Sequence, residues 1–244
     1  MKEHRHTLLE DYYFDVLRVV VEAFQNAGYN PILVGGAAVQ IHLIDLVGFE
    51  NAEEYLRKTD DYDMVIFGIN DEEVRDVINT LNGSYFATEN AAFLITVQRN
   101  GAKRPVLKVE YLNSEGEIKN EEIHVNISTK SDDLNHIYPK RAEFMYGDAV
   151  EIKIKHSRTL SELKVRVLRI EDLIATKITA GRDKDYVDVQ NLIESVRISG
   201  RALDWARIKE NVRSTKTDDS RIRATRYVRD LERGFGNKPA MILK

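Results

Sequence analysis

Two aspartates separated by one residue are the strongest chemical feature of this 244-residue chain. Asp61 and Asp63 open the run DYDMVIF, which has the length and composition of a buried strand. Side chains alternate along a strand, so the two carboxylates share one face and Tyr62 lies on the other. Adjacent carboxylates repel each other unless a cation lies between them, and Mg²⁺ prefers such oxygen ligands. The pair predicts a magnesium site; the alternative is a solvated acidic turn before a strand.

A third carboxylate would complete this metal site. Glu110 is the first candidate, because it lies in the predicted strand 106–112 and shares a face with Lys108. Glu122 is the rival, since it alternates with His124 and Asn126 on the next predicted strand. Either glutamate could equally be an ordinary exposed strand residue.

A glycine pair precedes the aspartates. Gly35 and Gly36 follow the short apolar run Ile32-Leu-Val and precede a helical pattern. Glycines between a strand and a helix allow close backbone approach and leave amides free to bind phosphate. The alternative is a tight strand-to-helix turn without a ligand.

A second cluster of charged residues lies between 169 and 189. Lys177 has apolar neighbours, where a lysine needs an anion nearby. Asp185 and Asp188 are three residues apart and would lie close together on a helix. The alternative interpretation is a set of salt bridges that join two helices, above all for Arg182 and Asp188.

The elements that would position these residues form an α+β pattern. Helices are predicted at 8–27, from Gly36 onward, at 71–82 and from 171 to 200, and strands at 32–34, 63–67, 92–98, 106–112, 122–127, 149–154 and 164–168. This order predicts a mixed β-sheet flanked by helices, not a regular βαβ succession. We expect a main domain at 1–168 and a helical C-terminal region at 169–244.

Composition excludes several functional classes. The chain has no cysteine, which removes disulfides, thiolate zinc sites and cysteine nucleophiles, and its six histidines lack metal-ligand spacing. The formal net charge of −4 argues against a general nucleic-acid binder, although residues 213–238 are locally basic. That segment predicts either a helix face for RNA phosphates or a solvated surface helix. No run is long enough to span a membrane, so we expect a cytoplasmic protein.

Two motifs together resemble a known superfamily. Leu33-Val-Gly-Gly-Ala-Ala followed by Thr59-Asp-Asp-Tyr-Asp-Met-Val resembles the motif of DNA polymerase beta-like nucleotidyltransferases. Glu171-Asp-Leu-Ile-Ala-Thr-Lys with Arg182-Asp-Lys-Asp-Tyr-Val-Asp-Val is similar to the later motif of the minimal members. The nearest group is the nucleotidyltransferase toxins of abortive-infection type IV toxin–antitoxin systems. The resemblance spans about residues 31 to 193.

This resemblance implies an activity. A nucleoside monophosphate would move from an NTP such as ATP to a hydroxyl of RNA (tRNA-like) or protein, with release of pyrophosphate. A toxin of this group would have a cognate antitoxin as partner. The resemblance also gives each candidate residue a role: Mg²⁺ binding by Asp61, Asp63 and Glu110; nucleotide binding by Gly35, Gly36, Lys177 and Lys184; and catalysis by the three acids with Lys177 and Asp185.

Three features depart from the superfamily pattern. Residues 37 to 60, 24 residues, separate Gly36 from Asp61, which predicts a looped-out insertion. Ala37 follows the glycines, so a hydroxyl that some members use on phosphate is absent. The third acid would be Glu110, where aspartate is usual. These departures leave two alternatives: a catalytically inactive nucleotide-binding or partner-binding module, and an antitoxin-like regulatory protein that acts through its basic helices.

Overall fold

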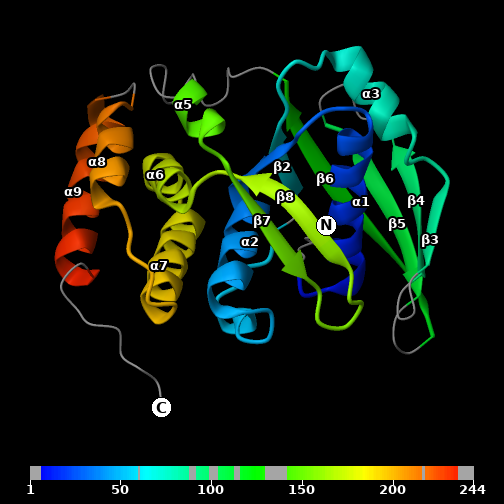
Figure 1. The fold of residues 1–244 in the computed structure, drawn as a ribbon, viewed down its shortest axis with the longest axis horizontal. Helices are drawn as coiled ribbons and strands as arrows, with labels where there is room; N and C mark the ends of the chain where they lie inside the picture. The colour runs from blue at the N-terminus through cyan, green and yellow to red at the C-terminus, as the bar shows by residue number, and fades with distance from the viewer. Residues whose placement is uncertain are drawn as a thin grey trace.

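A mixed eight-stranded sheet forms the centre of the molecule (Figure 1). The computed structural model describes residues 7–59, 61–87, 92–98, 104–112, 116–129, 142–215 and 218–235. The strands follow the order β3-β4-β5-β6-β2-β1-β8-β7. Their bounds are β1 Ile32–Val34, β2 Asp61–Val65, β3 Ser84–Ala87, β4 Ala92–Gln98, β5 Val106–Leu112, β6 Ile118–Ser128, β7 Val150–Lys155 and β8 Glu162–Val167. The predicted α+β fold with a mixed sheet is confirmed.

The central strands come from distant parts of the chain. β1 pairs antiparallel with β2 and parallel with β8, and β2 pairs parallel with β6. The three residues of β1 are apolar, which suits a strand that has neighbours on both edges. The two ends of the sheet are antiparallel, β3 to β6 on one side and β7 with β8 on the other.

Helices pack over the sheet and also lie beside one of its ends. They are α1 Asp11–Asn26, α2 Gly35–Val47, α3 Asp71–Asn79, α5 Ala142–Gly147, α6 Ile170–Ala180, α7 Asp183–Ile198, α8 Trp205–Arg213 and α9 Asp218–Phe235, with a short 3₁₀ turn η1 at Ala52–Glu54. On α1, Tyr13 packs against Tyr62 of β2, with ring centroids 4.6 Å apart. The last four helices gather beside the β7 end (Figure 1).

The C-terminal helices differ from the predicted single helix at 171–200. The chain breaks between α6 and α7, because Gly181 adopts the left-handed conformation (φ 65°) and Arg182 is extended. Strand β3 is also a correction, since residues 84–87 carried no predicted strand. The division at 168 stays a prediction: the last described strand ends at Val167, and each described element after it is a helix.

A buried ion pair fastens α8 to α6. Arg207 donates to both carboxylate oxygens of Asp172, at 2.7 and 2.5 Å, and Asp172 is fully buried. Helix α9 buries Ala224, Val228 and Leu231, while its four arginines at helical steps face solvent: Arg223, Arg226, Arg229 and Arg233. Across the residues with a described position, no helix is long and apolar enough to cross a membrane.

Candidate active site

The two aspartates lie together on one face of β2, as predicted. Tyr62 is fully buried on the α1 side, while Asp61 and Asp63 are half-buried on the opposite face. Asn126 of β6 stands directly opposite Asp63 in the parallel register. Its side-chain amide donates to Oδ2 of Asp61 and to Oδ1 of Asp63, both at 2.9 Å. One carboxamide therefore holds both carboxylates in position.

Glu110 does not join this pair, so its prediction as a third metal ligand is wrong. The register pairs Glu110 with Asn120, six residues along β6 from Asn126 (120 to 126). At about 3.3 Å per residue, Glu110 lies about 20 Å away, and its side chain is exposed. The rival Glu122 pairs with Lys108 instead. Within the described ranges, no three acidic, histidine or cysteine side chains cluster closely enough to share a metal ion.

The glycine turn lies directly against the aspartates. Helix α2 begins at Gly35, and no side chain caps its N-terminus at Val34. A Cβ at Gly35 would lie 2.1 Å from Oδ2 of Asp63, so only glycine leaves room for this carboxylate. Gly35 also has φ +66°, a conformation that other residues rarely adopt. The positive end of a 13-residue helix therefore faces the acidic pair, where an anion or the carboxylate gains stabilisation.

The expected looped-out insertion supplies part of the site. Its residues 37–47 belong to helix α2, and the chain then returns so that Thr59 contacts Gly36. A Cβ at Gly36 would lie 2.6 Å from Oγ1 of Thr59, and this hydroxyl donates to Asp61 at 3.1 Å. The missing hydroxyl at Ala37 thus has a substitute near the helix N-terminus, although Thr59 uses it to orient Asp61.

Lys177 lies at the centre of a buried ionic cluster. Its Nζ is 2.7 Å from Asp188 and 3.4 Å from Asp185. Asp188 also accepts two hydrogen bonds from Arg57, at 3.0 and 3.1 Å. Arg182 binds Asp185 in the same bidentate way, at 2.6 and 3.0 Å. The predicted salt bridges are therefore real, and they join α6, α7 and the segment before β2.

The cluster and the aspartate pair act on each other electrostatically. Burial and the neighbouring charge of Asp61 raise the pKa of Asp63 to about 6, while the Asn126 hydrogen bond and the charges of Lys177 and Lys184 oppose this rise. Asp185 behaves in the opposite way: burial opposes ionisation, but the Arg182 hydrogen bond and Lys177 hold its pKa below the ordinary value. The predicted residues other than Glu110 thus form one electrostatic unit.

The donor set fits Mg²⁺ bound jointly by protein and substrate. Mg²⁺ commonly takes one or two carboxylates together with phosphate oxygens and waters. Asp61 and Asp63 supply the carboxylates, and burial together with the negative charge of Asp61 raises the pKa of Asp63, a cost that a bound cation would offset. The free amides of the α2 N-terminus supply a neighbouring place for phosphate.

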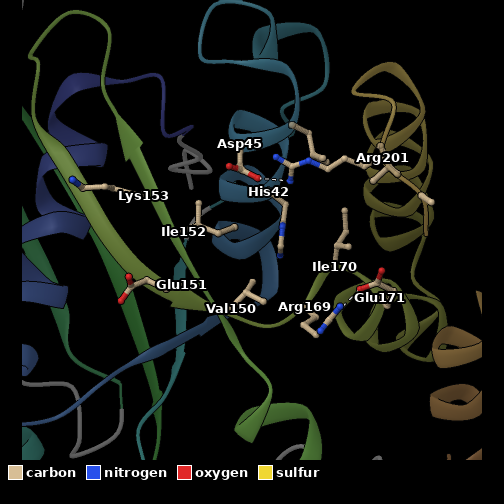
Figure 2. Close-up of a pocket in the computed structure, with 13 residues that line it drawn as sticks. His42, Asp45, Val150, Glu151, Ile152, Lys153, Arg169, Ile170, Glu171 and Arg201 are labelled. Carbon is tan, nitrogen blue, oxygen red and sulfur yellow. Dashed lines mark hydrogen bonds and ion pairs between the residues drawn. The ribbon is translucent and has the colours of Figure 1, made fainter. Parts of the chain in front are cut away.

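A cavity lies elsewhere, beside the C-terminal half of α2 (Figure 2). It has a volume of about 520 Å³, and its wall includes His42 and Asp45 of α2, strand β7 and the start of α6. His42 contacts the backbone oxygen of Leu168 at 2.7 Å, and burial lowers its pKa, so it is a neutral core histidine. Arg201 is paired with Asp45 at 2.7 Å. The cavity shares no residue with the aspartate site.

Three residues of the site were not predicted as functional. Asn126 was noted only for its alternation with Glu122, and Arg57 and Thr59 fell in a segment without periodicity. A parallel pairing of the strand at 122–127 with the aspartate strand would have identified Asn126. The sequence carries no comparable signal for Arg57, because its partner Asp188 lies 131 residues away.

Comparisons with known proteins show a likeness to a solved structure. No family model matches the chain, and no curated protein matches it. Among solved structures, the chain is similar to MenT4, a nucleotidyltransferase toxin from Mycobacterium tuberculosis H37Rv, with a TM-score of 0.47 and 10% sequence identity. The match covers 92% of this chain and 85% of MenT4.

Proposed function

We propose that this chain is a Mg²⁺-dependent nucleotidyltransferase, which moves a nucleoside monophosphate from an NTP to a hydroxyl of RNA or protein. One observation carries the proposal: Asp61 and Asp63, the N-terminus of α2 and the charge of Lys177 converge on one face of the sheet. Phosphoryl transfer needs this combination, because negative charge must be stabilised on the attacking, transferred and leaving groups.

Each part of the site has a chemical task in this proposal. Mg²⁺ bound at Asp61 and Asp63 would supply Lewis-acid stabilisation of the transferred phosphoryl group. The amides of Gly35 and Gly36 would bind phosphate oxygens at the positive end of α2. The exposed Lys184, whose charge already acts on Asp63, would meet the triphosphate from the opposite side.

Lys177 acts from within its ionic cluster. Its ammonium group is almost fully buried and bound to Asp188, so it is fixed in position. In the proposal it stabilises the negative charge on the phosphates, while Asp185 and Asp188 hold it in place. Arg57 completes the cluster by binding the other side of Asp188.

A toxin role and a cognate antitoxin belong to the same proposal. The motif resemblance supports them, and the exposed arginines of α9 are a candidate surface for an RNA acceptor. A second candidate function is a nucleotide-binding module without catalysis. It is favoured by one observation, that the residue opposite Asp63 on β6 is the uncharged Asn126 and not an acid.

A label-transfer assay separates the two functions. The chain is incubated with Mg²⁺, each of four α-³²P-labelled NTPs, and total tRNA or cell lysate as acceptor. We expect label on a macromolecule, lost in Asp63→Asn and retained in Glu110→Gln, whose side chain lies about 20 Å from the pair. Transfer that persists in Asp63→Asn would refute the proposal. Nucleotide binding without any transfer would favour the binding module.

A further inference from the structure

The aspartate pair has an uncharged neighbour at the position of a third ligand. Asn126 faces Asp63 across the parallel strands and donates to both carboxylates at 2.9 Å. An amide group is nearly isosteric with a carboxylate but carries no charge. The face therefore presents two negative charges, where an acid at the same position would present three.

No other acid of the neighbourhood is available to a cation. Asp188 is bound by both Arg57 and Lys177. Asp185 is bound by Arg182 on both carboxylate oxygens. Releasing Asp188 would leave the buried Lys177 without its nearest partner, and releasing Asp185 would break its two hydrogen bonds with Arg182. Among the described residues near the site, Asp61 and Asp63 alone remain to hold metal.

The cationic cluster lies beside the glycine turn, because a Cβ at Gly36 would lie 3.6 Å from Arg57, which shares Asp188 with Lys177. Lys177 and Lys184 both act electrostatically on Asp63, and Arg182 also feels the Asp63 charge. Two-metal centres place their ions about 3.5–4 Å apart, so the ions repel each other strongly and need several shared carboxylates. One divalent cation would neutralise the two aspartates here, and a second would find no further carboxylate among the described residues near the site that is not already bound.

We propose that Asn126 restricts this centre to a single divalent cation, with the lysines of α6 and α7 taking over the charge stabilisation that a second metal ion would give. The inference rests on the proposed function, because it assumes that the pair holds metal. In this arrangement the negative charge of the leaving pyrophosphate is met by the ammonium groups of Lys177 and Lys184. Asn126 itself is a positioning residue for Asp61 and Asp63.

The test counts metal ions directly with Mn²⁺ in place of Mg²⁺. Binding is titrated by electron paramagnetic resonance for the full chain, alone and with each of the four α,β-methylene nucleoside triphosphates. Two Mn²⁺ ions about 4 Å apart give a spin-coupled spectrum, whereas one ion does not. Wild type should bind one uncoupled Mn²⁺ at the site, lost in Asp63→Asn.

The isosteric variant Asn126→Asp supplies the contrast. It should bind two spin-coupled Mn²⁺ ions, the first about tenfold more tightly than wild type, and its circular dichroism spectrum should stay unchanged. Glu110→Gln is the matched control and should keep one ion. A coupled pair in wild type would overturn this inference and leave the proposed function intact, as would an Asn126→Asp variant identical to wild type. If none of the bound Mn²⁺ depends on Asp63, both this inference and the proposed function are overturned.

Discussion

Replacing Gly35 by alanine tests whether the glycine turn exists to accommodate Asp63. The new Cβ would lie 2.1 Å from Oδ2 of Asp63, and an ordinary contact needs more than 3 Å, so the carboxylate must move by at least about 1 Å. A misplacement of about 1 Å can cost roughly 100-fold in rate. The left-handed φ of +66° adds about 1–2 kcal/mol of strain, and crowding adds about 1–3 kcal/mol.

Gly28→Ala provides a matched control for backbone strain. Gly28 has φ +88°, but a Cβ there meets nothing within 4 Å. Denaturant unfolding should show a loss of about 1–2 kcal/mol for Gly28→Ala and about 2–5 kcal/mol for Gly35→Ala. Label transfer should fall about 100-fold only in Gly35→Ala, together with weaker Mn²⁺ binding. Equal stability and equal transfer in the two variants would refute the assigned role of Gly35.

Three further predictions follow from the ionic contacts. The stability of the metal-free protein should depend on pH through Asp63, because the pKa of this carboxyl is about 6 in the folded protein and 3.8 in its ordinary state. The folded state therefore binds the proton more tightly, and the free energy of unfolding should fall by up to about 3 kcal/mol as pH rises from 4 to 6. Denaturant titrations at several pH values should show no such decline for Asp63→Asn. The same dependence of the free energy of unfolding on pH in both proteins would contradict the prediction. Asp188→Asn should lower the free energy of unfolding in urea by about 3–5 kcal/mol, because Lys177 and Arg57 lose their shared partner. The control Arg226→Gln, at an exposed position, should change this free energy by less than about 0.5 kcal/mol. Lys184→Ala should raise the KM for the NTP with unchanged unfolding, since its side chain is exposed; an unchanged KM would exclude it from the nucleotide site.

Local periodicity was sufficient to predict most of the sheet and the face of the aspartates. Asp61, Tyr62 and Asp63 alternate as expected because a strand with one buried face admits only one register. The break at Gly181 was missed because the apolar spacing continues across it from α6 to α7. Strand β3 was missed because its four residues alternate only between half-buried and exposed.

The pairing of strands could not be predicted from periodicity. Glu110 and Asn126 both alternate correctly on their own strands, so either could share the aspartate face. Only the order β5-β6-β2 decides between them, and that order depends on contacts between distant segments. The role of Arg57 could not be predicted either, because no residue near it in the chain indicates that its partner is Asp188.

The contact between Arg57 and Asp188 has a consequence for biosynthesis. The site combines residues near positions 35, 60, 126 and 180, and its ionic cluster closes over a separation of 131 residues. A ribosome-bound chain that ends before α7 would carry the aspartate pair, the glycine turn and Lys177, but neither Lys184 nor Asp188, the partner of Arg57. The candidate site therefore becomes complete late in translation, after about three quarters of the chain has been synthesised.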